Sequence, residues 1–317
     1  MASEFDLIHR YFTRPTPSAI LGVGDDAALI QPSPGMVLAV AADMLVAGRH
    51  FAYNDSPETV GHKSLAVNLS DMAAMGANPR WVLLSLAIKE ADEAWLQGFS
   101  HGFFALAEEF GVELIGGDTT CGPLNLSVQI MGEVPPGQAL RRDGAHVGDE
   151  IWVSGTLGNA ALGLANLQQR IALTPSEAVV CQAALHMPQP RVVLGLALRG
   201  LATAAIDISD GLLADLGHIL ERSQVAAEIE FDRLPVSDIM RQYIENETAR
   251  QCLLAGGDDY ELCFTVPVSR HQEVRALSKS LDLPLTCIGS IKAGKELVLL
   301  EAGKPIPVIV KGFDHFA

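Results

Sequence analysis

Aspartates recur in glycine-rich corners of the chain, and they are the residues whose type and spacing could do chemistry. Six segments carry the pattern: 22–28, 41–43, 68–71, 116–120, 207–211 and 256–259. One such corner alone is typical of a structural turn or a helix cap, because Asp and Gly are common turn residues. Only 19% of the residues are charged, however, so six acidic corners favour a shared role.

Carboxylates that converge in a partly dry cleft repel one another, and this repulsion must be neutralised. The chain has only 22 Lys and Arg residues, and few of them lie in the acidic segments. Hard divalent cations with oxygen ligands, magnesium above all, are the natural solution. Zinc and copper are disfavoured because no His or Cys cluster has ligand spacing. Since magnesium held by few carboxylates usually arrives with substrate phosphates, the residues predict a multi-magnesium nucleotide site with an unassigned acceptor.

The acidic segments lie next to predicted strands and helices. Asp43, Asp118 and Asp207 directly follow predicted apolar strands, which is where open α/β sheets place ligands. Asp71 lies inside an apolar helix and shares a face with Asn68, three residues earlier. This pair fits a solvent-facing polar stripe of that helix equally well.

Short apolar runs alternate with helical patterns along the chain. Strands are predicted at 36–42, 81–88, 112–115, 125–134, 150–154, 204–208, 227–231, 260–266, 285–291, 297–301 and 307–311. Helices are predicted at 57–75, 93–110, 212–220 and 271–281. The mixture predicts α/β or α+β layering. Because 317 residues make about two domains, we expect a boundary in the turn-rich stretch near residue 147, giving domains 1–147 and 148–317.

The charge balance excludes some function classes. The chain carries 38 Asp and Glu against 22 Lys and Arg, a formal net charge of −16. Such a surface repels phosphate backbones and anionic lipid, which disfavours nucleic-acid and membrane-surface roles. The first residues do not resemble a signal peptide, and no apolar run reaches the ~18 residues of a membrane helix. The 5 scattered cysteines form no CxxC pair, so we expect a soluble cytoplasmic protein with reduced thiols.

A partial P-loop pattern occurs near the end of the chain. Residues 289–295 match the start of that motif, GxxxxGK, but Glu296 stands where a Ser or Thr would bind magnesium. A predicted strand also follows where the mechanism needs a helix N-terminus. We therefore interpret this segment as a turn between two strands.

Eight motifs occur in an order that is typical of one enzyme family. They are GVGDDAA, ADMLVAGRHF, NLSDMAAMGA, GGDTT, GDEIWVSGTLG, HMPQPRV, DISDGL and GGDDYELCFTV. Together they closely resemble the thiamine-monophosphate kinase family, part of the PurM-like superfamily typified by aminoimidazole-ribotide synthetase. Single motifs such as GGD are weak, but their order over nearly the whole chain is specific.

The resemblance implies both an activity and an architecture. The implied reaction is ATP-dependent phosphorylation of thiamine monophosphate to thiamine diphosphate, by direct in-line γ-phosphoryl transfer that several magnesium ions assist. No catalytic side chain is implied beyond this metal-assisted transfer. The implied fold is the PurM-like two-domain fold. Its N-terminal domain binds ATP and metal and pairs its sheet with a second copy in a homodimer, and a C-terminal α/β domain completes the cleft.

The resemblance also implies site residues, motif by motif. The implied magnesium ligands are Asp26, Asp43, Asp71, Asp118, Asp207 and Asp210, with Ala42 through its backbone only. The implied nucleotide contacts are Gly117, Asp118, Arg142 and Ser209, and the implied thiamine-phosphate contacts are His50, Asp258 and Phe313. Without the resemblance, His50 is more simply a loop histidine, Arg142 a solvated charge, and Phe313 equally a core residue.

Two departures from the family pattern keep alternatives open. Ala41 and Ala42 stand where the family usually has Thr or Ser, so a metal contact there must use a backbone oxygen or water. Asp258 replaces the usual glutamate and is one methylene shorter. The alternatives are another PurM-like ATP-dependent enzyme, of the aminoimidazole-ribotide synthetase type, and a non-catalytic nucleotide-binding dimer.

Overall fold

The computed structural model describes residues 3–307, and the chain divides into two compact units. The first unit comprises Met1–Met72 and Ala77–Gly137, and the second comprises Ala73–Gly76 and Gln138–Ala317. Each unit contains its own sheet together with helices, so the predicted mixed α/β layering is confirmed.

A four-stranded sheet forms the basis of the first unit. Its strands are β1 (Val37–Val46), β2 (Asn78–Ile88), β3 (Glu113–Cys121) and β4 (Asn125–Val134), in the order β1-β4-β2-β3. The helical segments are α1 (Glu4–Leu7), η1 (Ile8–Phe12), α2 (Pro57–Ala74) and α3 (Glu93–Phe110). Strand β4 is antiparallel to β1 and β2, whereas β2 and β3 are parallel, and α3 supplies the crossover that a parallel pair needs.

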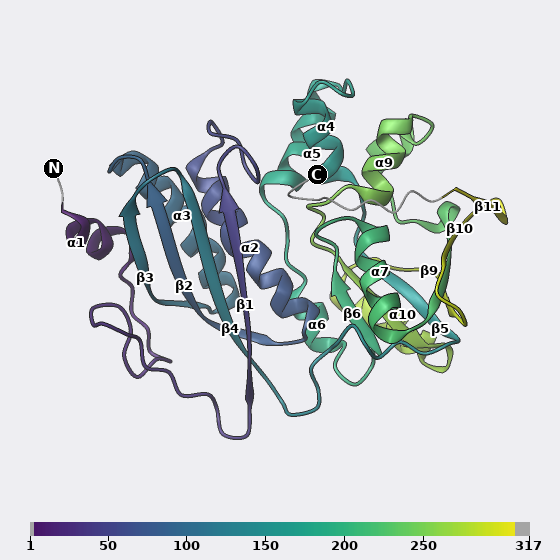
Figure 1. Ribbon diagram of the computed structural model, residues 1–317, viewed down its shortest axis with the longest axis horizontal. Helices are drawn as coiled ribbons and strands as arrows, with labels where there is room; N and C mark the ends of the chain where they lie inside the picture. Colours follow the sequence, from purple (N-terminus) through teal and green to yellow (C-terminus); the bar gives the residue numbers. More distant parts are fainter. Residues whose placement is uncertain (1–2, 308–317) are drawn as a thin grey trace. The chain divides into compact units, whose positions relative to one another are not determined.

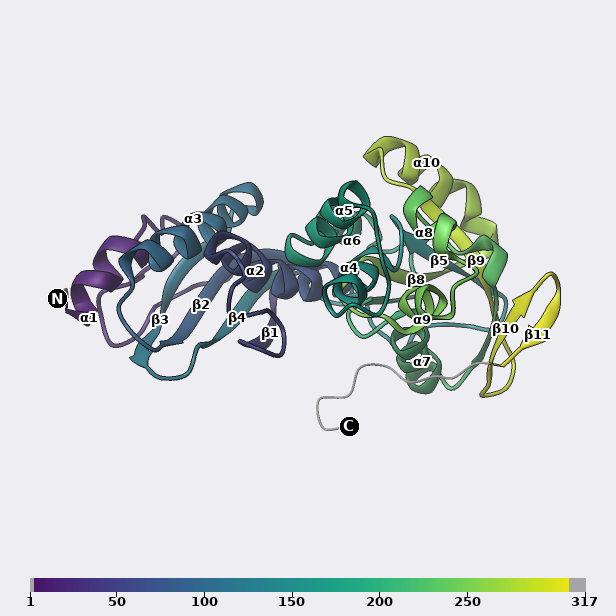
Figure 2. The same ribbon diagram turned by 90° about the horizontal axis from the view of Figure 1, so that it is seen from above.

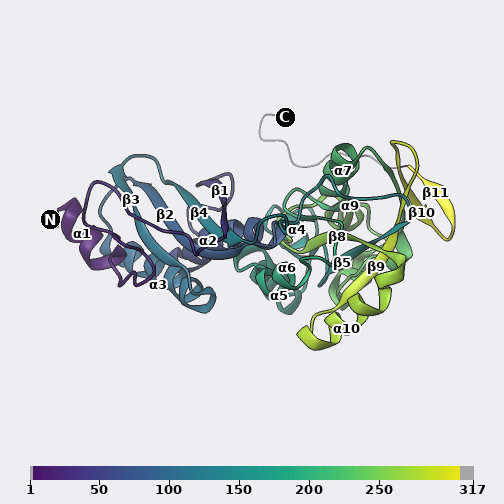
Figure 3. The ribbon, with the colours of Figure 1, turned by 90° about the horizontal axis from the view of Figure 1, so that it is seen from below.

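Helices α2 and α3 cover one face of this sheet (Figures 1–3). Helix α3 forms because apolar residues recur at helical spacing, and its Phe99 and Phe103 side chains are fully buried. Asp92 caps the start of the helix by accepting two backbone N–H groups of the first turn, and Gly111, with a φ of 64°, ends it. The sequence therefore predicted the bounds of this helix correctly.

Strands β1 and β3 extend further than the sequence predicted. Asp43 and Asp118 lie inside these strands and do not follow them, which corrects the expectation for both residues. The length of a strand depends on its hydrogen-bonding partner and not only on its apolar side chains. Here β4 pairs with β1 as far as Val46, and β2 pairs with β3 as far as Cys121.

The second unit is built on a seven-stranded sheet in the order β11-β10-β7-β9-β5-β8-β6. Its strands are β5 (Asp149–Ser154), β6 (Ala204–Asp207), β7 (Ala226–Glu230), β8 (Leu262–Pro267), β9 (Leu285–Lys292), β10 (Leu297–Glu301) and β11 (Lys304–Ile306). Its helical segments are α4 (Asn159–Leu167), α5 (Pro175–His186), α6 (Val192–Ala197), α7 (Leu212–Ser223), η2 (Phe231–Arg233), α8 (Asp238–Tyr243), α9 (Glu247–Ala255), η3 (Val268–Arg270) and α10 (His271–Leu281). No helix within residues 3–307 is long and apolar enough to cross a bilayer.

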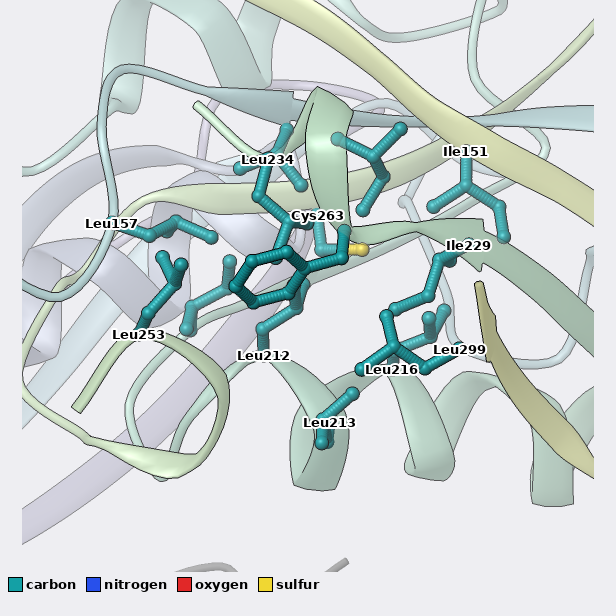
Figure 4. Close-up of a cluster of buried hydrophobic side chains, with 14 of the residues drawn as sticks. Ile151, Leu157, Leu212, Leu213, Leu216, Ile229, Leu234, Leu253, Cys263 and Leu299 are labelled. Atoms are coloured by element: carbon teal, nitrogen blue, oxygen red, sulfur yellow. The ribbon is translucent and has the colours of Figure 1, made fainter. Parts of the chain in front are cut away.

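The core of the second unit packs α7 against the sheet (Figure 4). Leu212 and Leu216 of α7 are buried together with Ile151 of β5, Ile229 of β7 and Leu299 of β10. Burial of a leucine or isoleucine side chain contributes about 1.5–3 kcal/mol relative to exposure. Helix α7 is therefore firmly held, and so is its N-terminal end next to β6.

Only the end of the P-loop pattern in the second unit lies between two strands, so the predicted turn is correct for residues 293–295 and wrong for residues 289–292, which belong to β9. Gly289 lies inside β9, opposite Ile229 of β7 and Ile151 of β5. Lys295 lies between the end of β9 and the start of β10. No helix begins there, so the geometry that cradles phosphate in a P-loop is missing from this segment.

Candidate functional site

The acidic segment after β6 forms a tight loop that leads into α7 in the second unit. Asp207 is buried and is the last residue of β6, so it ends this strand and does not follow it, contrary to the expectation from the sequence. Gly211 precedes α7 with a φ of 110° and provides no side-chain cap. A Cβ atom at this position would lie 2.6 Å from the backbone of Ala255, so only glycine fits in conformation and in space.

Asp215, in the first turn of α7, folds back onto this loop. Its Oδ2 atom accepts hydrogen bonds from the backbone N–H groups of Ser209 and Asp210, both at 3.0 Å. The residue is only 3% exposed. Burial raises the pKa of Asp215 to about 7, and the nearby charges of Asp207 and Asp210 act in the same direction.

The sequence interpretation did not single out Asp215. A usable signal was present, since an acidic residue in the first turn of a helix follows a glycine that cannot cap the helix with a side chain.

The segment that carries Asp258 lies against the same loop. The Asp258 N–H donates to the Ser209 carbonyl at 2.9 Å, and the Tyr260 N–H donates to the Ile208 carbonyl at 2.8 Å. The Tyr260 hydroxyl also donates to Asp258 Oδ1 at 3.2 Å. Both Asp258 (φ 69°) and Tyr260 (φ 49°) adopt the left-handed conformation, which is uncommon for residues other than glycine. The structure thus brings the implied nucleotide residue Ser209 next to the implied substrate residue Asp258.

The carboxylates of Asp259 and Glu261 hold the segment that carries Asp258 in place. Both oxygens of Asp259 accept the Gly158 N–H at 2.9 Å, and the loss of water around this carboxyl raises the Asp259 pKa well above its ordinary value. Glu261 forms a bidentate ion pair with Arg191 and accepts the Ser154 hydroxyl at 2.5 Å. Arg191 belongs to the HMPQPRV motif, to which the sequence interpretation assigned no role.

In the first unit, the sheet register separates Asp43 from Asp118. The cross-strand row that contains Asp43 runs through Val128 and Leu84 to Gly117. Residues in one row face the same side of a sheet, and successive residues of a strand alternate. Asp118 therefore faces the opposite side of the sheet from Asp43, and the sheet alone does not bring the two carboxylates together.

Gly117 allows an unusually close approach between neighbouring strands. A Cβ atom at this position would lie 1.8 Å from the Leu84 carbonyl oxygen. Only glycine can therefore precede Asp118 in this strand.

Asn68 and Asp71 are not a solvent-facing stripe of α2, so that alternative is wrong. Asn68 is fully buried, and Asp71 is partly buried. The Asn68 Nδ2 group donates to the Ser64 carbonyl at 3.0 Å. Its Oδ1 atom is buried without a hydrogen-bond partner among residues 3–307, and such an atom needs an explanation.

The donor chemistry of these residues fits magnesium better than zinc or copper. The implied ligands are carboxylate oxygens, which hard cations prefer, and the orphaned Asn68 oxygen lies one helical turn before Asp71. In the part of the chain that the structure describes, no cluster of three or more His, Cys, Asp or Glu side chains could hold a metal ion. The residues fit the cation by type, although residues 3–307 form no complete ligand shell.

The other residues of the first unit that the resemblance implies lie in β1 or in the loops that precede and follow it in the sequence. Ala42 lies inside the strand, opposite Gln129 of β4. The His50 Nδ1 atom accepts the Val46 N–H at 3.0 Å, so the neutral ring carries its proton on Nε2. Asp26 lies in an exposed loop before β1, and its N–H donates to Asp25 Oδ1 at 2.9 Å.

The backbone of Arg142 does not lie close to Ser209. The Arg142 carbonyl accepts the hydroxyl of Ser223, the last residue of α7, at 2.8 Å, whereas Ser209 precedes the first turn of this helix. A helix of 12 residues is about 18 Å long. The exposed Arg142 side chain would have to span most of that distance. Phe313 lies outside the described residues.

Both parts of the chain match domain families. Residues 24–134 match the family of the AIR synthase related protein, N-terminal domain. Residues 146–300 match the family of the AIR synthase related protein, C-terminal domain. The acidic segments that the structure describes, apart from the first residues of the 22–28 corner, all lie within these two ranges.

Individual relatives match over nearly the full length. The thiamine-monophosphate kinase of Escherichia coli (strain K12) is 46% identical, over 99% of this chain and 98% of that protein. The crystal structure of thiamine-monophosphate kinase from Stenotrophomonas maltophilia K279a has a TM-score of 0.85 and 51% identity, covering 89% of this chain and 91% of that one. The structure of AaThiL complexed with AMPPCP and TMP has a TM-score of 0.79 and 32% identity, covering 90% and 89%.

Proposed function

The chain belongs to the thiamine-monophosphate kinase family, within the AIR synthase related proteins, and we propose that it transfers the γ-phosphoryl group of ATP to thiamine monophosphate, giving thiamine diphosphate. The observation that carries this proposal is the match to thiamine-monophosphate kinases over 99% of the chain. A relative of the same fold binds AMPPCP and TMP, which supports ATP and thiamine monophosphate as the two substrates.

The reaction suits a protein that offers carboxylates and no strong base. The acceptor phosphate has a second pKa near ~6, so its oxygen is largely deprotonated at neutral pH. The protein then has to hold two polyanions in line and neutralise the transferring group. Magnesium, when bound, supplies this neutralisation.

Asp26, Asp43, Asp71 and Asp118 of the first unit, and Asp207 and Asp210 of the second, are the proposed magnesium ligands. Their oxygen donors and the orphaned buried oxygen of Asn68 support this set. Ala42 has no hydroxyl group and can contribute only its backbone.

The remaining proposed residues bind the two substrates. Gly117, with the adjacent Asp118, and the Ser209 loop are proposed to contact the nucleotide, together with Arg142. His50 and Asp258 are proposed to contact thiamine monophosphate, as is Phe313. The His50 ring, with its proton on Nε2, is suited to donate a hydrogen bond to a phosphate oxygen.

Asp258 is proposed to face the cationic thiazolium or the aminopyrimidine of thiamine. Such a contact explains why an acidic side chain lies near a substrate whose phosphate is anionic. The hydrogen bond from Tyr260 to its carboxylate supports a fixed orientation for this side chain.

The first unit offers a surface that is suited to homodimer formation, which we propose as the assembly. One face of β1 exposes large apolar side chains, among them Val40 (65% exposed) and Met44 (60%). Exposed apolar rows of this kind mark protein–protein interfaces. Analytical ultracentrifugation should show a dimer that Val40→Asp dissociates, whereas Val179→Asp, on the exposed face of α5, should leave it intact. A monomeric parent protein would contradict the proposal.

The cytoplasm is the proposed location. All 5 cysteines are free, and Cys181, Cys252 and Cys263 are buried, which supports a reducing compartment.

A turnover assay tests the proposed activity. Purified protein with ATP, thiamine monophosphate and magnesium should release ADP and thiamine diphosphate in equal amounts, and a chelator should stop both. ATP turnover that does not depend on thiamine monophosphate would instead favour another ATP-dependent member of the superfamily. Nucleotide binding without any turnover would favour the non-catalytic dimer.

A further inference from the structure

The loop between β6 and α7 is held by its backbone from two sides. The N–H groups of Ser209 and Asp210 both donate to Asp215 Oδ2 at 3.0 Å. From the other side, the Ser209 carbonyl accepts the Asp258 N–H, and the Ile208 carbonyl accepts the Tyr260 N–H. The residues that carry the proposed metal and nucleotide contacts of the second unit are thus fixed through main-chain hydrogen bonds.

Asp215 is well placed to hold this loop because its own helix is immobilised. The side chain is 3% exposed and lies in the first turn of α7, whose Leu212, Leu213 and Leu216 are packed into the core of the unit (Figure 4). Buried hydrogen-bonded groups of this kind rigidify what they contact, whereas exposed ones compete with water. The Asp215 carboxylate therefore holds the β6–α7 loop in a fixed position relative to α7.

These hydrogen bonds are not an ordinary helix cap. A capping side chain precedes the helix and accepts N–H groups inside the first turn, which would otherwise be unpaired. Asp215 does the reverse, since it lies inside the helix and accepts N–H groups of residues that precede Gly211. The helix does not need these two contacts for its own hydrogen bonding, so their effect falls on the loop.

We infer that Asp215 is a positioning residue of this site, which fixes the Ser209 and Asp210 backbone so that Asp207 and Asp210 keep the arrangement that receives metal and nucleotide. The identity of what the loop binds rests on the proposed function. The fixing of the loop by Asp215 does not, and it can be measured without substrate.

Variants of Asp215 separate the hydrogen bonds from the charge. Asp215→Ala removes the acceptor of both N–H groups. Asp215→Asn keeps an acceptor oxygen, because both N–H groups point at the same atom in the structure. Asp149→Ala is the matched control: this residue of the same unit is 5% exposed and also accepts a backbone N–H, from His146 at 3.0 Å.

Hydrogen exchange in the free protein is the direct readout. In the parent protein, the Ser209 and Asp210 amides should exchange at least about tenfold more slowly than unprotected amides. Asp215→Ala should abolish this protection, while Asp215→Asn should keep most of it and Asp149→Ala should leave it unchanged. Unprotected Ser209 and Asp210 amides in the parent protein would overturn the inference, even if Asp215→Ala does not fold.

Kinetics then test the consequence at the site. Asp215→Ala should raise the magnesium concentration for half-maximal activity by about tenfold or more and lower kcat, and Asp215→Asn should restore both within about threefold. Asp149→Ala should lose thermal stability but keep the parent's magnesium dependence. An Asp215→Ala enzyme with the same magnesium dependence as Asp149→Ala would overturn the inference, as would an Asp215→Asn enzyme as impaired as Asp215→Ala.

Failure of the proposed function would look different. In that case the parent protein would form no thiamine diphosphate, while the exchange measurement would still decide whether Asp215 holds the loop.

Discussion

The segment that carries Asp258 should lose stability when either partner of the buried Arg191–Glu261 ion pair is removed alone, because a buried charge is then left unpaired. Arg191 Nε lies 2.6 Å from Glu261 Oε2, and Nη2 contacts Oε1, so the pair is bidentate. The Ser154 hydroxyl completes the surroundings of the carboxylate. The Glu261 side chain is only 6% exposed, and that of Arg191 is 25% exposed.

Replacement of Arg191 by Met keeps much of the side-chain volume and leaves the Glu261 carboxylate buried, with a hydrogen bond from the Ser154 hydroxyl but without its cation. Removing one member of a buried ion pair costs about 3–5 kcal/mol. Water reaches the Arg191 end of the pair, so we expect the lower value, about 3 kcal/mol. For a unit of this size, that loss corresponds to a fall in Tm of about 6–12 °C.

Urea and thermal unfolding of Arg191→Met measure this loss. The control is Arg233→Met, because Arg233 pairs with Glu230 at 3.1 Å in the same unit but both side chains are exposed. That variant should stay within about 1 kcal/mol of the parent protein. The double variant Arg191→Met/Glu261→Gln should recover part of the loss, since it no longer buries an unpaired charge. Equal losses in Arg191→Met and Arg233→Met, or no recovery in the double variant, would refute this reasoning.

Four further substitutions test individual residues of the account. Asp118→Asn should reduce turnover by about a hundredfold or more, because an amide is a much weaker ligand for a hard cation, and parent-like turnover would remove Asp118 from the site. Asp258→Ala should raise the KM for thiamine monophosphate much more than that for ATP, and equal changes would assign the residue to the nucleotide or to structure. Lys295→Ala should change turnover by less than about tenfold, and a loss of several hundredfold would restore the P-loop interpretation. Asp259→Asn tests pH dependence: the raised pKa of Asp259 means that the folded protein holds a proton which the unfolded chain, with a pKa near ~3.9, releases. Asp259 therefore contributes its full stabilisation below the unfolded-state pKa, and this contribution is lost as the pH rises towards the folded-state pKa. The Tm of Asp259→Asn relative to that of the parent protein should increase between about pH 5 and about pH 8, and a Tm difference that stays constant would contradict this assignment.

The elements that the sequence predicted best are those with a local signal of their own. Helix α3 has an apolar stripe through Phe99 and Phe103, a capping Asp92 and a terminating Gly111, so both of its ends are encoded nearby. Helix α5 was missed because its buried residues do not form a long stripe. Its capping box between Thr174 and Glu177 was nevertheless readable.

Features that depend on partners distant in the chain could not be predicted in this way. Asp43 lies inside β1 only because β4 continues to pair with that strand. The contact of Asp258 with Ser209 joins residues far apart in the sequence. Asp215 carries a local signal as an acid in the first turn of α7, but its two hydrogen bonds depend on the return of the β6–α7 loop onto this helix, which the sequence does not show.

The family resemblance predicted the fold class and the activity better than any single residue pattern did. Eight ordered motifs carried it, and the matches of 46% and 51% identity to thiamine-monophosphate kinases confirm it. The roles of the individual site residues stay predictions, because the identity of a motif does not fix the contacts of its side chains.

Transfer of a labelled γ-phosphate tests the central claim most directly. The purified protein should be incubated with magnesium, thiamine monophosphate and ATP that carries the label only in its γ-phosphoryl group. The account predicts that the label appears in thiamine diphosphate, in its terminal phosphate, in step with the release of unlabelled ADP. Label that appears only in inorganic phosphate, or that stays in ATP, would contradict it.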